Sequence, residues 1–162
     1  MDRRTFIRIA AGGACIALLP SLAAKALADE GIVRITRTDE EWRKLLTSAQ
    51  YRILREAGTE RPFSSPLDHE WRTGTYACAG CGLALFPSNF KYDSGTGWPS
   101  FYDVLPGHVE TRPDLSFAMV RTEYHCARCG GHQGHLFHDG PRPTGLRYCN
   151  NGLALHFIPE KG

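Results

Sequence analysis

The sequence lacks a long apolar run, a surplus of charge of either sign and the repeats of a fibrous protein. Its 162 residues carry 19 Lys and Arg against 17 Asp and Glu, and 42% of them are apolar. Such a chain can bury the core of one domain and is too short for two comfortable ones. The composition excludes a disordered chain, a coiled coil and a collagen-like fibre. Its 17 glycines and 10 prolines predict many turns.

The small positive charge is concentrated near the N-terminus. Residues 1–28 hold four basic residues against Asp2 alone, which leaves 15 basic and 16 acidic residues in the remainder. A protein that binds nucleic acid by neutralising phosphates needs a basic surplus, and the main body has none. We therefore expect no nucleic-acid partner.

Residues 1–28 have the organisation of an export signal. Sixteen uncharged residues, 9–24, follow a basic start, and Ala26-Leu27-Ala28 provides the small residues of a signal-peptidase site. Residues 2–8, DRRTFIR, resemble a twin-arginine signal, which exports folded proteins across the bacterial inner membrane. Sixteen residues fall short of the roughly 20 that span a bilayer, so a retained anchor is the less favoured alternative. We expect a cleaved signal peptide, a mature domain over 29–162 and a periplasmic location without stable membrane association.

The mature part predicts two short helices followed by a mainly β domain. Thr38 and Glu41 have the spacing of a capping box, so a helix is expected to begin near Asp39. Ser48 is the expected cap of a second helix, which Gly58 ends. After a polar loop over 60–72, β-branched and aromatic residues alternate with turn residues. We expect antiparallel sheets in a barrel-like arrangement, with strands over 75–78, 83–86, 108–111, 115–124, 136–137, 146–149 and 153–158.

Two C-x-x-C turns predict a metal site. Such turns point pairs of thiolates at one tetrahedral ion, and two turns supply the four ligands of a structural zinc. The 44 residues between the turns require the fold to bring them together. Four protein ligands leave no open position, so we expect one zinc per chain without a catalytic role. Two disulfides or one redox-active pair are the alternatives. The ligands are Cys78, Cys81, Cys126 and Cys129.

Cys149 is left without a cysteine partner. If Cys15 is removed with the signal, the mature chain holds an odd number of cysteines. On a strand, Arg147, Cys149 and Asn151 would share one face. A guanidinium beside a thiol favours the thiolate, which is the nucleophilic form. A cysteine packed as a small hydrophobe is the alternative.

Three histidines and a tryptophan are the remaining candidates. His132, His135 and His138 recur every three residues among glycines, which indicates a loop and a strand on which this spacing does not converge them. We expect them to act as proton donors near a reactive thiol rather than as metal ligands. Trp98, before the rigid Pro99, can present its indole as an apolar wall, and a core turn is the alternative.

Together these motifs resemble the methionine-R-sulfoxide reductases of the B type. The resemblance runs from about Asp39 to Pro159 and rests on both C-x-x-C turns and on the segments GTERPF (58–63), YDSGTGWPSF (92–101), HQGHLFHDGP (132–141) and PTGLRYCNN (143–151).

This resemblance implies that the protein reduces methionine-R-sulfoxide, mainly in oxidised proteins or peptides, to methionine. Cys149 would be the nucleophile, Trp98 would receive the substrate methyl group, and zinc would lie away from the active site. The sulfenic acid left on Cys149 must then be reduced by a thiol. The other implied pocket residues are His132, His135, Phe137, Asp139, Arg147 and Asn151.

Three positions depart from the family pattern. Thr96 stands where many members carry a resolving cysteine, so the usual internal disulfide cannot form, and an external thiol such as a thioredoxin-like protein is expected instead. Asn150 replaces a common aliphatic residue and Gly152 a common serine. The competing hypothesis is a zinc-containing β module that binds oxidised or apolar peptides without turnover. A nucleophile beside Arg147 favours the enzyme.

Overall fold

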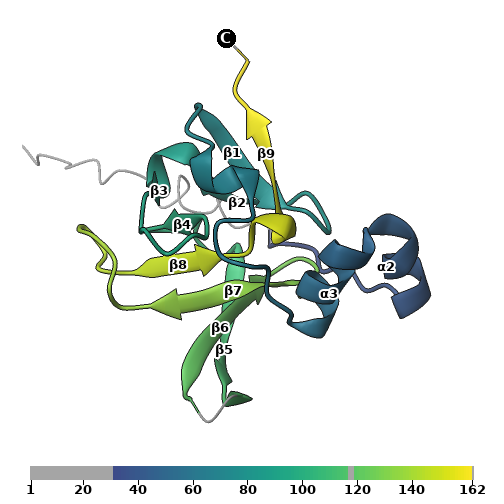
Figure 1. The fold of residues 1–162 in the computed structure, drawn as a ribbon. Coiled ribbons are helices and arrows are strands. Elements are labelled where there is room, and N and C mark those ends of the chain that lie inside the picture. Colours follow the sequence, from purple (N-terminus) through teal and green to yellow (C-terminus); the bar gives the residue numbers. More distant parts are fainter. Residues whose placement is uncertain (1–30, 117–118, 162) are drawn as a thin grey trace, which may run out of the picture. The chain divides into compact units, whose positions relative to one another are not determined.

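A computed structural model describes residues 31–116 and 119–161 (Figure 1). The predicted signal peptide at 1–28 lies outside these residues. Within them, no helix is both long enough and apolar enough to cross a bilayer.

Two capped helices, α2 (Asp39–Leu45) and α3 (Ser48–Glu56), open the described part. The predicted capping box is confirmed, because the Thr38 hydroxyl accepts from the amide of Glu41 and the Glu41 carboxylate accepts from the amide of Thr38. The predicted cap of the second helix is wrong by one residue. Thr47 caps α3 in a second capping box, and the helix ends because Ala57, rather than Gly58, adopts a left-handed φ of 50°.

The strands form two antiparallel sheets, which confirms the mainly β prediction. One sheet has the order β2-β1-β9 and the other the order β3-β4-β8-β7-β6-β5. Among the described strands both sheets keep open edges, and no closed barrel is found. The strands are β1 (Gly74–Cys78), β2 (Ala84–Pro87), β3 (Lys91–Tyr92), β4 (Ser100–Phe101), β5 (Val109–Asp114), β6 (Arg121–Cys126), β7 (His132–Phe137), β8 (Arg147–Asn150) and β9 (Leu155–Pro159).

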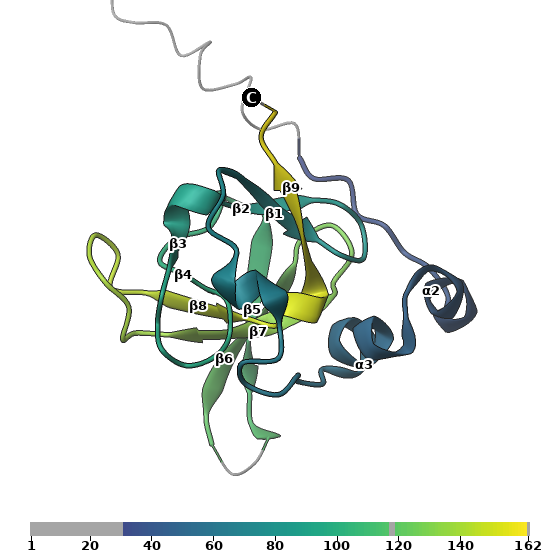
Figure 2. The ribbon, with the colours of Figure 1, turned by 45° about the horizontal axis from the view of Figure 1, so that its top comes forward.

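Short 3-10 helices fill the connections. The predicted polar loop over 60–72 is confirmed and contains η1 (Pro66–His69), while η2 (Ser88–Phe90) precedes β3. A third, η4 (Gly152–Ala154), separates β8 from β9, so the strand predicted over 153–158 begins only at Leu155. Figure 2 shows α2 and α3 beside the sheets and the β5–β6 hairpin extending away from them.

Two further strand predictions are corrected. The strand predicted over 115–124 is wrong in its first half, because β6 begins at Arg121 and the exposed Leu115, Met119 and Val120 belong to the hairpin turn. Conversely, β7 begins at His132, well before the predicted residue 136. Its Gly134 is required, since a Cβ there would lie 1.9 Å from the carbonyl oxygen of Cys149 on the neighbouring strand.

An aromatic core fixes β8 from one side. The rings of Phe86 and Phe101 stack with centroids 4.1 Å apart, and the ring of Tyr148 lies 5.9 Å from Phe86. Because side chains alternate along a strand, Tyr148 and Asn150 are buried while Cys149 between them is directed to the opposite face, where it is partly exposed.

Candidate functional site

The four paired cysteines lie together in one cluster. Their sulfur atoms all lie within 4.8 Å of one another. The closest pairs are Cys78 with Cys129 at 3.7 Å and Cys81 with Cys126 at 3.5 Å, which is too long for a disulfide bond of about 2.05 Å. All cysteines in the described residues are free. The alternative of two disulfides is therefore not borne out in this part of the chain.

The turns that present these cysteines have the backbone expected of metal-binding turns. Gly82 and Gly130, which follow the two pairs, have φ angles of 73° and 68°, and their amides donate to the carbonyls of Cys78 and Cys126. Four thiolate donors in a largely buried cluster fit a tetrahedral zinc ion. They form a possible metal-binding site, as the spacing predicts.

Cys149 opens onto a separate cavity of about 150 Å³. The structure brings most of the predicted site residues to this cavity, whereas His132, Asp139 and Arg147 are not among the lining residues. Sequence reasoning missed the side chains of Thr59 and Arg121, and it named Asn150 only as a departure from the family pattern. The lining residues are Thr59, Trp98, Arg121, Gly134, His135, Phe137, Cys149, Asn150 and Asn151.

Two opposing influences act on the pKa of Cys149. Burial raises the pKa of the thiol, while Arg147 and a hydrogen bond from Thr96 lower it without offsetting the burial. The expectation that Arg147 favours the thiolate is correct in direction, but burial outweighs it. Arg147 itself is held by two 2.8 Å hydrogen bonds to Asp139, and its guanidinium lies 4.3 Å from the centroid of the Phe137 ring.

Thr96 stands beside Cys149, at the position where a resolving cysteine is common. Its hydroxyl is 2.8 Å from that of Ser94, which in turn is 2.7 Å from that of Ser100. A short row of hydroxyl groups therefore leads to the thiol. In this chain the position supports Cys149 with a hydrogen bond and cannot form a disulfide with it.

His132 and His135 do converge, contrary to the expectation from their spacing. His132 lies opposite His125, and His135 lies opposite Glu123, so three steps along β7 correspond to two steps along β6. This β-bulge brings both histidines to one face, with ring centroids 5.5 Å apart. His138 follows the end of β7 and is exposed.

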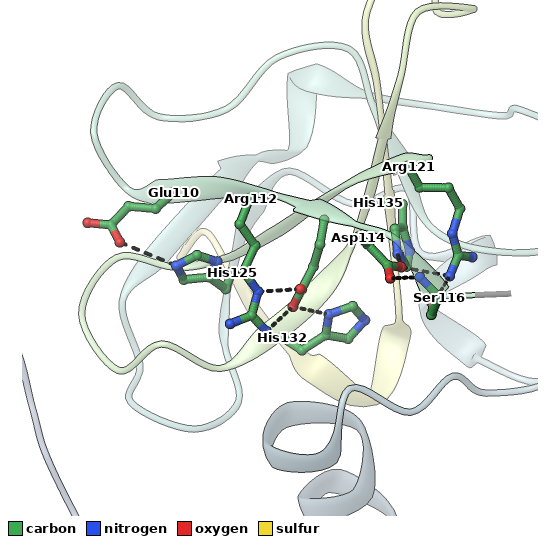
Figure 3. Close-up of polar contacts among 9 residues, drawn as sticks. Glu110, Arg112, Asp114, Ser116, Arg121, His125, His132 and His135 are labelled. Carbon is green, nitrogen blue, oxygen red and sulfur yellow. Dashed lines mark hydrogen bonds and ion pairs between the residues drawn. The ribbon is translucent and has the colours of Figure 1, made fainter. Parts of the chain in front are cut away.

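Each of these histidines is bonded to a carboxylate of the β5–β6 hairpin (Figure 3). Glu123 Oε1 accepts from His132 Nδ1 at 2.7 Å, and the Glu123 carboxylate also accepts from Arg112. Asp114 Oδ2 lies 2.7 Å from His135 Nε2 and 2.7 Å from Arg121 Nη2. No local sequence pattern predicts these contacts, since they depend on how β5, β6 and β7 pair in the sheet.

The ionisation of these groups follows from the pairing. Hydrogen bonds from Ser116, together with His135 and Arg121, hold the pKa of Asp114 well below its usual range. Burial lowers the pKa of His132, against the opposing effect of Glu123. Burial raises the pKa of Glu123, but its hydrogen bonds with Arg112 and His132 outweigh this and lower the pKa. Both carboxylates are therefore anionic near neutral pH, and His132 is neutral.

Asn150 and Gln133, both fully buried, connect the two cysteine regions. Gln133 Nε2 donates to the sulfur of Cys78 at 3.4 Å, and its Oε1 accepts from Asn150 at 3.5 Å. Asn150 Oδ1 accepts from the Tyr124 hydroxyl at 2.6 Å. The polar residue at 150, where an aliphatic one is common in the family, is thus satisfied by Tyr124 and Gln133.

Comparison with known proteins is consistent with this site. A SelR domain model matches residues 46–159. The chain is 52% identical over 128 residues to a peptide methionine sulfoxide reductase MsrB of Bradyrhizobium diazoefficiens, covering 78% of this chain and 92% of that protein. A protein of the same name from Leptospira interrogans is 54% identical, over 78% of this chain and 97% of its own length. Another from Pseudomonas putida is 53% identical, over 80% of this chain and 98% of its own length.

Matches of this extent decide between the two hypotheses, because they are to enzymes and not to binding modules. The chain belongs to the SelR-domain family and is a peptide methionine sulfoxide reductase of the MsrB type.

Proposed function

We propose that this reductase acts on the R epimer of methionine sulfoxide, mainly in oxidised proteins, with Cys149 as its nucleophile and an external thiol as its reductant. The observation that carries the proposal is the cavity that gathers Cys149, Trp98 and His135 on its wall. In the net reaction the substrate sulfur loses its oxygen and gains an electron pair. The oxygen ends on Cys149, whose thiol becomes a sulfenic acid.

His135 is the proposed proton donor to the sulfoxide oxygen, directly or through water. It lines the cavity, whereas His132 is 4% exposed and is not among the lining residues. Asp114 fixes the orientation of the His135 ring, since its carboxylate holds Nε2. His132 packs against His135 and supports it.

Arg147 and Thr96 stabilise the thiolate that attacks the substrate. Because burial raises the pKa of Cys149, the resting thiol is protonated near neutral pH. In the complex with substrate the thiol gives up this proton, which replaces the one that His135 donates to the sulfoxide oxygen. Asp139 orients Arg147 through their paired hydrogen bonds.

Trp98 and Phe137 form the apolar part of the cavity. We assign the substrate methyl group to the Trp98 ring, which leaves the sulfoxide oxygen directed toward His135 and Asn151. Such a fixed wall allows one epimer to present its sulfur to Cys149.

Zinc is the proposed occupant of the four-cysteine cluster, at one ion per chain. When bound it would hold the two turns together and contribute directly to folding free energy. Cys78, Cys81, Cys126 and Cys129 would supply all four ligands, so no position remains for substrate.

Recycling then requires a thiol from outside the chain, because the other described cysteines form the cluster and position 96 is threonine. One thiol condenses with the sulfenic acid and releases water, and a second thiol reduces the mixed disulfide. A thioredoxin-like dithiol protein supplies both. From residues 1–28 we further propose export to the periplasm, cleavage of the signal and repair of exported proteins there.

The test is incubation of the purified protein with dithiothreitol and the separate R and S sulfoxides of a blocked methionine. We expect methionine from the R epimer and none from the S epimer. Equal turnover of both epimers would reject the proposed pocket. Replacing Trp98 with Ala should lower kcat/KM for the R epimer more than it lowers stability.

A further inference from the structure

The segment that follows Cys149 is held by one buried carboxylate from a distant loop. Glu60 is 5% exposed, and its two oxygens accept hydrogen bonds from the backbone amides of Gly152 at 2.5 Å and Leu153 at 3.1 Å. These amides open η4, where helical geometry leaves donors without partners. Glu60 therefore caps η4 across 92 residues of sequence.

This cap changes what the side chain of Asn151 does. Asn151 occupies the N-cap position of η4, where an asparagine commonly turns back to accept from the first amides of its own helix. Its side chain makes no such bond. Instead Oδ1 accepts from the amide of Glu60 at 3.0 Å and the hydroxyl of Thr59 at 3.2 Å, while Nδ2 donates to the carbonyl of Gln133 at 3.0 Å. Asn151 thereby stays at the wall of the Cys149 cavity.

Glu60 is a buried carboxylate at a position where an uncharged side chain of the same size would fill the space equally well. Glu60 forms no ion pair within the described residues. Burial raises the pKa of Glu60, although the hydrogen bonds from both amides lower it. Glutamine would fill the same volume without burying a charge. A carboxylate, however, offers two acceptor oxygens and an amide only one, and two consecutive amides need both. The chemistry therefore matches the need for two hydrogen bonds.

The cap leaves little room for the segment to shift. A Cβ on Gly152 would lie 1.9 Å from the hydroxyl oxygen of Ser65 and 3.3 Å from Oε1 of Glu60. Glycine at 152, where serine is common in the family, is thus required by this close approach. Glu60 and Ser65 together confine the start of η4.

We propose that Glu60 is a positioning residue, which keeps Asn151 turned toward the reacting sulfoxide by occupying the amides that Asn151 would otherwise cap. It acts through Asn151 and touches no reacting atom. The inference rests on the proposed function of the Cys149 cavity.

The test compares Glu60→Gln and Glu60→Ala with the control Glu70→Gln. Glu70 belongs to the same loop but pairs with Arg72 and makes no contact with η4 amides. A single turnover of the R sulfoxide without reductant gives a rate constant and a yield of methionine per chain. In Glu60→Gln we expect the rate constant to fall about 10- to 100-fold at an unchanged yield, which is the effect of displacing a substrate-positioning group such as Asn151 by ~1 Å. Glu70→Gln should match the wild type.

A second readout does not depend on turnover. The NMR signals of the Asn151 side-chain amide should shift in Glu60→Gln and not in Glu70→Gln. An unchanged rate constant in Glu60→Gln would overturn the proposal, as would a lower yield at an unchanged rate constant or the loss of folded protein in both Glu60 variants. If the wild type itself forms no methionine, the proposed function fails instead, and the NMR comparison still decides the position of Asn151.

Discussion

The protein places cysteine in two regions with opposite surroundings. In the cluster, four sulfur atoms lie within 4.8 Å of one another and have each other as neighbours. Cys149 stands alone on β8, beside a cavity, with a cation and hydroxyl groups as neighbours. The same side chain is suited to metal binding in one place and to nucleophilic chemistry in the other. The difference is made by the fold around it rather than by the residue.

The largest effect is expected from breaking the cluster. Cys126→Ser removes one of the four proposed zinc ligands. Because a structural zinc contributes folding free energy, the variant should unfold or aggregate and lose all activity. Circular dichroism and elemental analysis check this, with about one zinc per chain expected for the wild type. A metal-free wild-type protein that is folded and active would contradict it.

Breaking the other region should remove activity alone. Cys149→Ser is expected to abolish turnover, since an alcohol with a pKa far above neutrality is a poor nucleophile without a dedicated base. Zinc content and the melting temperature should stay near those of the wild type, in contrast to Cys126→Ser. Near-normal activity in Cys149→Ser would mean that another thiol is the nucleophile.

Several parts of this comparison were predictable from sequence and others were not. The C-x-x-C turns and the Thr38 capping box are local patterns, so their geometry follows from spacing alone. The convergence of His132 and His135 depends on a bulge at the β6–β7 pairing, which no spacing within β7 reveals.

Tertiary surroundings explain the remaining differences. Asp114 reaches His135 from 21 residues away, through the register of the sheet. The balance at Cys149 depends on burial, which the adjacent Arg147 does not indicate. The apolar residues of the β5–β6 turn suggest a strand, yet they are exposed because the hairpin extends beyond the core.

An intermediate effect is expected on the pH dependence of Cys149. Since burial raises its pKa, alkylation by iodoacetamide should have a midpoint above that of a free thiol, about 8.5. Arg147→Met should move the midpoint further up, because it removes the nearest stabilising charge, while Arg142→Met on an exposed loop should not. Because the pKa of Cys149 is higher in the folded than in the unfolded protein, the stability that the protonated thiol contributes is lost as the pH rises through the folded pKa. A midpoint below that of a free thiol would contradict the burial argument.

The smallest effect is expected from weakening the link between the two regions. Tyr124→Phe leaves the buried Oδ1 of Asn150 without its 2.6 Å hydrogen bond, which should cost about 1–3 kcal/mol of unfolding free energy. Urea denaturation of the zinc-loaded protein measures this. The zinc content should not change, because the cluster keeps its own four sulfur atoms. Loss of zinc in this variant would show that the two regions are more tightly coupled than their separate surroundings imply.

The central claim is that the two kinds of cysteine do not exchange roles, and the most direct test is mass spectrometry of the enzyme after one turnover without reductant. We expect the peptide that contains Cys149 to gain one oxygen atom, the sulfenic acid to be trapped by a sulfenic-specific reagent, and zinc to stay bound. A disulfide between Cys149 and Cys78, Cys81, Cys126 or Cys129, with zinc released, would contradict the account.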